Sequence, residues 1–152
     1  MSLDTKVPPP AVAFASAVVI WGIARFAPRV ALPSEIRLAV CLALVMVGAA
    51  LAAAGVLSFH RVRTTVHPTR PEEASSLVST GIYRFTRNPM YLGLLAILVA
   101  WAVFLSSAWA LLGAAGFVLY ISRFQIAPEE RALSKLFGSE YASYKASVRR
   151  WL

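Results

Sequence analysis

The fold is decided by the stretch NPMYLGLLAILVAWAVFLSSAWALLGAAGFVLYIS at residues 88–122, in which no residue carries a charge. As one helix it would be about 52 Å long, whereas the hydrocarbon core of a bilayer is roughly 30 Å thick. The stretch is therefore expected to fold back on itself, with the turn at Ser106-Ser107. This predicts a hairpin of two membrane-spanning helices, over residues 89–105 and 108–125.

Two further uncharged stretches precede this hairpin. One lies between Lys6 and Arg25 and the other between Arg37 and Arg61, and each is long enough for one span, over 9–26 and 37–59. The 152-residue chain is 59% hydrophobic and 14% charged, whereas about a quarter of the residues of a soluble domain are charged. We therefore predict an all-α integral membrane protein with about four transmembrane helices and short cytoplasmic helices at its C-terminal end.

The formal net charge of +8 would suit a nucleic-acid-binding protein, but the positions of the basic residues argue against one. Three of the 15 Lys and Arg residues, at positions 25, 29 and 37, lie around the first loop, and the others lie at the termini and in the second loop. Because cytoplasmic loops of membrane proteins are rich in Lys and Arg, this predicts cytoplasmic termini. The protein is expected in the inner (cytoplasmic) membrane, against anionic lipids and without nucleic acid.

The chain is expected to form one domain over 1–152, in which residues 1–60 are scaffold and 61–152 carry the chemistry. Gly48 and Ala52 in the second span have the spacing that lets helix backbones approach closely, and such faces could also pair two copies of the chain. The loop at 60–88 mixes polar and apolar residues and is expected to fold against the helices. It contains His60 and His67, and two histidines without a third ligand do not indicate a metal site.

One candidate cluster lies where the third span begins. Arg87 and Asn88 supply hydrogen-bond donors at the membrane edge, Pro89 can start the helix, and Gly93 leaves room for a ligand or another helix. Tyr83 and Tyr91 flank this segment. The alternative interpretation is that the arginine sets the topology and the tyrosines form an aromatic belt at the interface.

A second candidate cluster, Arg123 with Glu129-Glu130, follows the fourth span. Acidic side chains are unexpected beside anionic headgroups, although they also suit the first turn of a helix that Pro128 could start. Gly138 is expected to break that helix, and the stretch from Glu140 to Trp151 is expected to form a second, amphipathic helix at the interface.

Together these stretches resemble the isoprenylcysteine carboxyl methyltransferase family, with phospholipid methyltransferases as wider relatives. The resemblance lies in LVSTGIYRFTRNPMYLG at 77–93 and EERALSKLFGSEYASYKASVRRWL at 129–152, with HPTRP at 67–71 before them. It implies S-adenosylmethionine as the methyl donor, bound on the cytoplasmic side. The residues that it assigns to the cofactor site are Tyr83, Arg87, Asn88, Pro89, Tyr91, Gly93, Glu129, Glu130 and Tyr141.

The resemblance places Arg123 near an acceptor carboxylate, and Glu130 is the candidate base if the acceptor must lose a proton. The sequence therefore predicts methyl transfer to a lipid-like or small amphiphilic acceptor, a carboxylate in the first instance. A phospholipid amine and a small thiol or alcohol remain alternatives. A non-catalytic membrane subunit is the alternative from another class; a transporter is disfavoured because the four expected spans lack ionisable residues in their middle.

Overall fold

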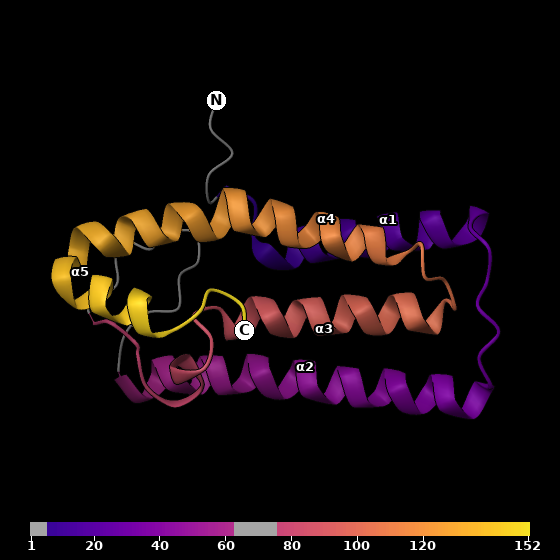
Figure 1. The fold of residues 1–152 in the computed structure, drawn as a ribbon, viewed down its shortest axis with the longest axis horizontal. Helices are drawn as coiled ribbons and strands as arrows, with labels where there is room; N and C mark the ends of the chain where they lie inside the picture. Colours follow the sequence, from indigo (N-terminus) through magenta and orange to yellow (C-terminus); the bar gives the residue numbers. More distant parts are fainter. Residues whose placement is uncertain (1–5, 63–75) are drawn as a thin grey trace.

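Four helices lie side by side in the computed structural model, which describes residues 6–62 and 76–152 (Figure 1). They are α1 (Pro9–Phe26), α2 (Ser34–Val62), α3 (Pro89–Phe104) and α4 (Leu111–Ile121). A 3₁₀ turn at Gly81–Arg84 precedes α3, and α4 continues through a π-helical turn at Ser122–Ile126 into α5 (Ala127–Ser147). All regular secondary structure among the described residues is thus helical, which confirms the all-α membrane fold.

The expected hairpin is present, and its turn lies at the expected serines. Ser106 has a positive φ of 55° directly after α3. Among the described residues, three helices are long and apolar enough to cross a membrane: α1, α2 and the continuous helix that α4 begins. The other member of the hairpin, α3, has 16 residues, about 24 Å of helix and less than a full hydrocarbon core. A fourth crossing by α3 therefore stays a prediction.

The backbones of α2 and α3 approach each other closely at two facing glycines. A Cβ atom built on Gly48 would lie 2.7 Å from the carbonyl oxygen of Gly93, and one built on Gly93 would lie 2.6 Å from that of Gly48. Only glycine fits such a contact on either helix. The sequence leaves open whether a ligand or another helix lies beside Gly93. In the structure, helix α2 lies there. A cofactor contact at Gly93 stays a prediction.

Large apolar side chains cover the outside of the bundle, as expected of a surface in lipid. Phe14 on α1, Met46 on α2 and Leu119 on α4 each expose about 70% of their surface, at 73%, 69% and 72%. The core instead contains Ile20, Phe117 and smaller residues from α1, α3 and α4. Since so much exposed apolar surface is rare on soluble monomers, the structure agrees with the membrane assignment from sequence.

Pro128 lies in the first turn of α5, as expected, but α5 does not begin as a separate helix. Backbone dihedrals stay helical at Ile121 and Ala127, so α4 continues into α5 as far as the break at Gly138. A proline inside an α-helix lacks an N–H and crowds the preceding turn. Here the wider π-helical turn at Ser122–Ile126 stands directly before the proline and takes up the change in hydrogen-bond register.

The helix expected over Glu140–Trp151 ends earlier than predicted. The break at Gly138 is confirmed, because this residue has φ 49° and ψ −119° inside α5. The helix then stops at Ser147, and Val148 is extended. Residues 148–152, which we call the C-terminal tail, return to the start of α3 (Figure 1). Their backbone oxygens are bonded there by side chains and backbone of the chain before α3, and this replaces further helical bonds.

The glycine contact generates a stability prediction. Gly93→Ala should lower the unfolding free energy by about 1–3 kcal/mol, because its methyl group would overlap the Gly48 carbonyl and push α2 away from α3. Gly116→Ala is the matched control, since a Cβ there meets nothing within 4 Å. Thermal unfolding of the detergent-solubilised protein measures both. Equal melting temperatures for the two variants would contradict the close contact.

Candidate active site

The predicted site residues gather at one end of the bundle, where α3 begins and α5 folds back (Figure 1). Three segments that are distant in sequence meet there: residues 86–91, the first turn of α5 and the C-terminal tail. The two acidic residues of that first turn, Glu129 and Glu130, contact different partners.

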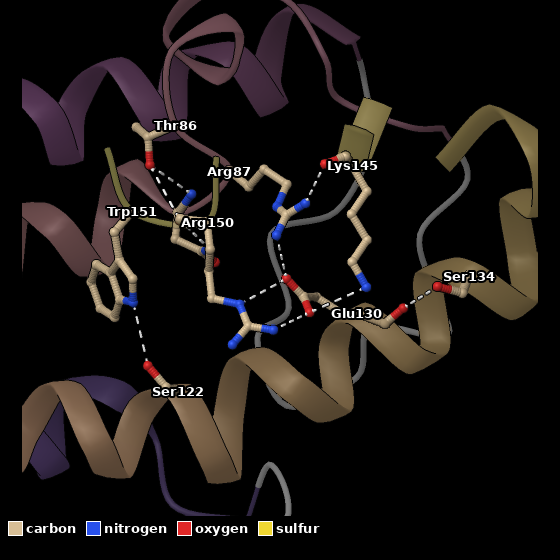
Figure 2. Close-up of polar contacts among 9 residues, drawn as sticks. Thr86, Arg87, Ser122, Glu130, Ser134, Lys145, Arg150 and Trp151 are labelled. Carbon is tan, nitrogen blue, oxygen red and sulfur yellow. Dashed lines mark hydrogen bonds and ion pairs between the residues drawn. The ribbon is translucent and has the colours of Figure 1, made fainter. Parts of the chain in front are cut away.

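Glu130 is held by two arginines. Arg87 Nη2 donates to its Oε1 at 3.0 Å, and Arg150 donates through Nε to Oε1 at 3.1 Å and through Nη2 to Oε2 at 2.6 Å (Figure 2). Lys145 Nζ lies 3.9 Å from Oε2. The side chains of Arg87 and Glu130 are each only 9% exposed, so this is a largely buried ion pair. Both carboxylate oxygens are thereby occupied by charge-assisted bonds.

The same segment before α3 also fixes the C-terminal tail through its backbone. The amide of Arg87 donates to the carbonyl of Arg149 at 3.0 Å, and its Nη1 donates to the carbonyl of Lys145 at 2.9 Å. Asn88 Nδ2 donates to the carbonyl of Arg150 at 2.8 Å. At the end of the tail, Trp151 Nε1 donates to Ser122 Oγ at 3.3 Å (Figure 2). The tail is thus laid across the start of α3 and against the π-helical turn.

Glu129 differs from its neighbour because its partners are neutral. The hydroxyl of Tyr91 donates to its Oε1 at 2.5 Å. Burial raises the pKa of the Glu129 carboxyl to about 8, against the hydrogen bonds from Tyr91 and Gln125, which lower it. The nearby Glu130 raises this pKa further, and among the described residues no cation contributes to it. Glu129 is therefore a half-buried carboxyl group whose raised pKa favours its protonated form, with no compensating cation among the described residues.

Tyr83 and Tyr141 lie in a separate apolar cluster between the 3₁₀ turn and α5. Tyr83 stacks edge-on against Phe59 with ring centroids 5.5 Å apart, and its carbonyl accepts a hydrogen bond from the Tyr144 hydroxyl at 2.8 Å. Tyr141 is 3% exposed. This cluster confirms the expectation that the apolar residues after position 76 fold against the helices. His67 and the segment 67–71 lie outside the described residues.

Arg123 is placed apart from the paired acids. It is exposed on the π-helical turn, with its guanidinium carbon 5.4 Å from the centre of the Phe124 ring. Pro89 is buried at the first turn of α3, as expected. The structure therefore brings together Arg87, Asn88, Tyr91 and the acidic pair, and places Arg123 at the edge of this group.

Arg150 and Lys145 were missed by the sequence interpretation, which placed the whole stretch from Glu140 to Trp151 in an amphipathic helix at the interface. Their pairing with Glu130 depends on the return of the tail after Ser147. A usable signal was present nonetheless. An acidic pair that becomes buried needs compensating cations, and the basic residues at 145, 149 and 150 were available to supply them.

Comparison with known proteins agrees with this geometry. The family model described as phospholipid methyltransferase matches residues 36–140, about two thirds of the chain. The chain belongs to this phospholipid methyltransferase family. It is accordingly a membrane methyltransferase, and the isoprenylcysteine methyltransferase resemblance is confirmed by relatives of that name. No solved structure matches the chain.

Three relatives illustrate the range of named proteins to which this chain is similar. An uncharacterized protein of Haemophilus influenzae is 54% identical over 63 residues, which are 41% of this chain and all of that protein. Methanethiol S-methyltransferase 1 of Bradyrhizobium diazoefficiens is 46% identical over 67 residues, or 44% of this chain and 22% of the enzyme. Protein-S-isoprenylcysteine O-methyltransferase A of Arabidopsis thaliana is 32% identical over 110 residues, or 70% of this chain and 54% of the enzyme. The match thus spans about half of the plant enzyme and less of the bacterial S-methyltransferase.

The ion pairs of Glu130 generate the second prediction. Glu130→Gln should lower the unfolding free energy by about 3 kcal/mol, because it leaves the largely buried Arg87 without its anion. The tail should also become accessible to carboxypeptidase. The exposed Glu140 provides the control, and Glu140→Gln should change neither readout. If the Glu130 variant kept both wild-type stability and a protected tail, the ion pairs would not hold the tail in place.

Proposed function

We propose that this family member transfers a methyl group from S-adenosylmethionine to the carboxylate of an amphiphilic acceptor that reaches the site from the bilayer. One observation carries the proposal. Of two adjacent acidic residues, Glu130 is neutralised by arginines, whereas Glu129 is half-buried beside Tyr91, and no cation among the described residues contributes to its pKa. A half-buried carboxyl of this kind is suited to pair with a cationic ligand.

The residues present fit S-adenosylmethionine, which carries an ammonium group, a sulfonium group and a carboxylate. Glu129 offers a carboxyl for one of the positive groups. Arg87 offers a donor for the carboxylate, because its Nε is buried and has no hydrogen-bond partner in the described part of the chain. Bound there, the cofactor would supply an activated methyl group on sulfur.

The other predicted cofactor residues would position the groups of the site and line its walls. Tyr91 orients the carboxyl of Glu129 through its 2.5 Å hydrogen bond, and Pro89 sets where α3 begins. Asn88 holds the tail over this position through the carbonyl of Arg150. Tyr83 and Tyr141 form an apolar wall that excludes water. A dry, preorganised surrounding of this kind favours a reaction in which charge is neutralised.

The basic character of the site supports an anionic acceptor. Arg87, Lys145 and Arg150 surround Glu130, and Arg123 is exposed on the π-helical turn that precedes α5. An acceptor carboxylate could be held by Arg123 in a two-pronged contact, and it needs no base. Glu130, the sequence-based candidate for a base, would have to give up Arg150 before it could take a proton.

A thiol acceptor is the second candidate, because the Bradyrhizobium relative bears the name of a methanethiol S-methyltransferase. The phospholipid amine implied by the family description is a third, and it would bring a cationic acceptor among the arginines. We further propose that the site and both termini face the cytoplasm, in the inner membrane. This rests on the Lys and Arg residues around the site.

The raised pKa of Glu129 generates a pH prediction. With a pKa of about 8, the free carboxyl is ionised above pH 8 and becomes protonated as the pH falls, so the charge available to a cationic donor is lost toward pH 6. The affinity for S-adenosylmethionine should therefore fall by about 10-fold per pH unit below 8. Glu129→Gln should remove this dependence and weaken binding at pH 8 by roughly 1.5–3 kcal/mol.

Calorimetry on the detergent-purified protein at pH 6, 7 and 8 measures this effect. Comparison of wild type with the Glu129 variant cancels the titration of the ligand's own amine. Glu140→Gln is again the matched control and should follow the wild-type curve. Identical pH profiles for wild type and Glu129→Gln would show that Glu129 does not pair with the donor, and would remove the observation on which the proposal depends.

The identity of the acceptor generates the fourth prediction. If Arg123 holds a carboxylate through two parallel hydrogen bonds, Arg123→Lys should reduce methyl transfer by at least about 10-fold, because lysine cannot reproduce that geometry. Affinity for S-adenosylhomocysteine should stay close to wild type. Membranes incubated with radiolabelled methyl donor should contain label that mild base releases, since methyl esters are base-labile.

The other acceptors give different results in the same assay. Base-stable label in the lipid extract, with Arg123→Lys nearly as active as wild type, would indicate an amine. Volatile label formed when methanethiol is added would indicate S-methylation. Either outcome would reject the carboxylate while leaving the cofactor site intact.

A further inference from the structure

The end of the bundle opposite the acidic pair contains a pocket. Its lining comes from the loop between α1 and α2, the start of α2 and the end of α3, which all lie at the same end of the molecule (Figure 1). The pocket measures about 430 Å³ and is lined by Arg29, Val30, Ala31, Leu32, Arg37, Phe104, Leu105 and Ser106. None of these residues belongs to the methyltransferase site.

The charged residues of the lining are both arginines. In the described part of the chain, no hydrogen bond or ion pair engages Arg29, which is exposed. Arg37 donates from Nη1 to Ser106 Oγ at 2.9 Å, and a neutral hydroxyl does not compensate its charge. Glu35, the nearest acid in sequence, is exposed and accepts a hydrogen bond from Ser34. The lining therefore carries two positive charges and no carboxylate, which suits an anion.

The backbone of this pocket is held in a strained form. Ser106 adopts φ 55°, a conformation that costs a residue other than glycine roughly 1–3 kcal/mol. Its carbonyl accepts a hydrogen bond from the amide of Val30 at 2.7 Å, and its hydroxyl accepts the bond from Arg37. One strained residue thus joins the loop, α2 and the α3–α4 turn. This keeps the two arginines on a fixed frame.

The remaining walls are apolar and continue into the lipid-facing surface. Val30, Leu32 and Phe104 line the pocket and are 44%, 41% and 50% exposed. Trp109, in the turn after α3, is 59% exposed, as tryptophans at the headgroup level of a bilayer commonly are. A freely soluble anion would gain nothing from these walls, whereas a lipid would cover them with its glycerol and upper chains.

We propose that this pocket binds the phosphate of an anionic phospholipid, at the membrane face opposite the methyltransferase site. Arg29 and Arg37 hold the phosphate, and the apolar walls hold the adjoining part of the lipid. A zwitterionic headgroup binds less well, because its cation would meet two guanidinium groups and no carboxylate in the lining. The site does not depend on which acceptor is methylated.

Native mass spectrometry of the full chain tests the proposal. Protein transferred into nanodiscs of equal parts phosphatidylglycerol and phosphatidylcholine should retain phosphatidylglycerol preferentially. Arg29→Gln and Arg37→Gln should each lower the retained ratio of the two lipids by at least about 10-fold. Arg25→Gln is the matched control. It removes the same charge at the same end of the bundle, but Arg25 lies over the Trp21 ring, 5.9 Å from its centre, and outside the pocket.

Several results would overturn the lipid site. Equal retention of the two lipids by wild type, or an equal loss in the Arg25 variant, would show attraction by net charge alone. Displacement of phosphatidylglycerol by millimolar inorganic phosphate would indicate a site for a free anion. Arg37→Gln also removes a bond to Ser106 and could unfold the loop, so the exposed Arg29 decides the outcome if that variant is unstable. Unchanged binding of S-adenosylhomocysteine by Arg29→Gln verifies that the protein is folded.

Discussion

The carboxylate of Glu130 joins three parts of the chain that are distant in sequence: the first turn of α5, the segment before α3 and the C-terminal tail. It lies in the first turn of α5 and bonds Arg87 before α3 and Arg150 in the tail. A charge this deeply placed is tolerated only when it is fully paired, so Arg87 and Arg150 must both reach it. These ion pairs hold the tail and the first turn of α5 against the segment before α3.

The two adjacent acids, Glu129 and Glu130, have different roles: one stabilises the structure, and the other is available for binding. Glu130 is saturated by guanidinium groups, whereas Glu129 is turned toward Tyr91 and has neutral partners. Neighbouring residues on a helix point about 100° apart, so one can face the tail while the other faces α3. The paired acid fixes the frame, and the unpaired acid remains available to a ligand. Adjacent residues of one type can thus have separate roles that their sequence position does not distinguish.

The opposite end of the bundle uses arginines in another way. At the acidic end, Arg87 and Arg150 are neutralised within the protein, while Arg29 and Arg37 line a pocket that contains no acid. Between the two ends, the Gly48–Gly93 contact brings α2 and α3 to backbone distance. Other α3 side chains, Met90 and Ile97, also pack against the glycines of α2. The apolar surface of α1, α2 and α4 is left to the lipid.

The sequence by itself determined the membrane class, the α3–α4 hairpin, the extent of α1 and the gathering of Arg87, Asn88, Tyr91 and the acidic pair. The first three follow from local features: uncharged length against bilayer thickness, and the break at Ser106-Ser107. The gathering of the site residues was implied by the resemblance to the isoprenylcysteine carboxyl methyltransferase family. Tertiary structure alone decided that α5 continues α4 through the π-helical turn, and that the tail leaves the helix at Ser147. It also decided that Glu130 is bound by Arg150 while Glu129 is not. The physical reason is that a buried charge selects its partner by distance in space, and residues 130 and 150 become neighbours only after the chain turns at Gly138.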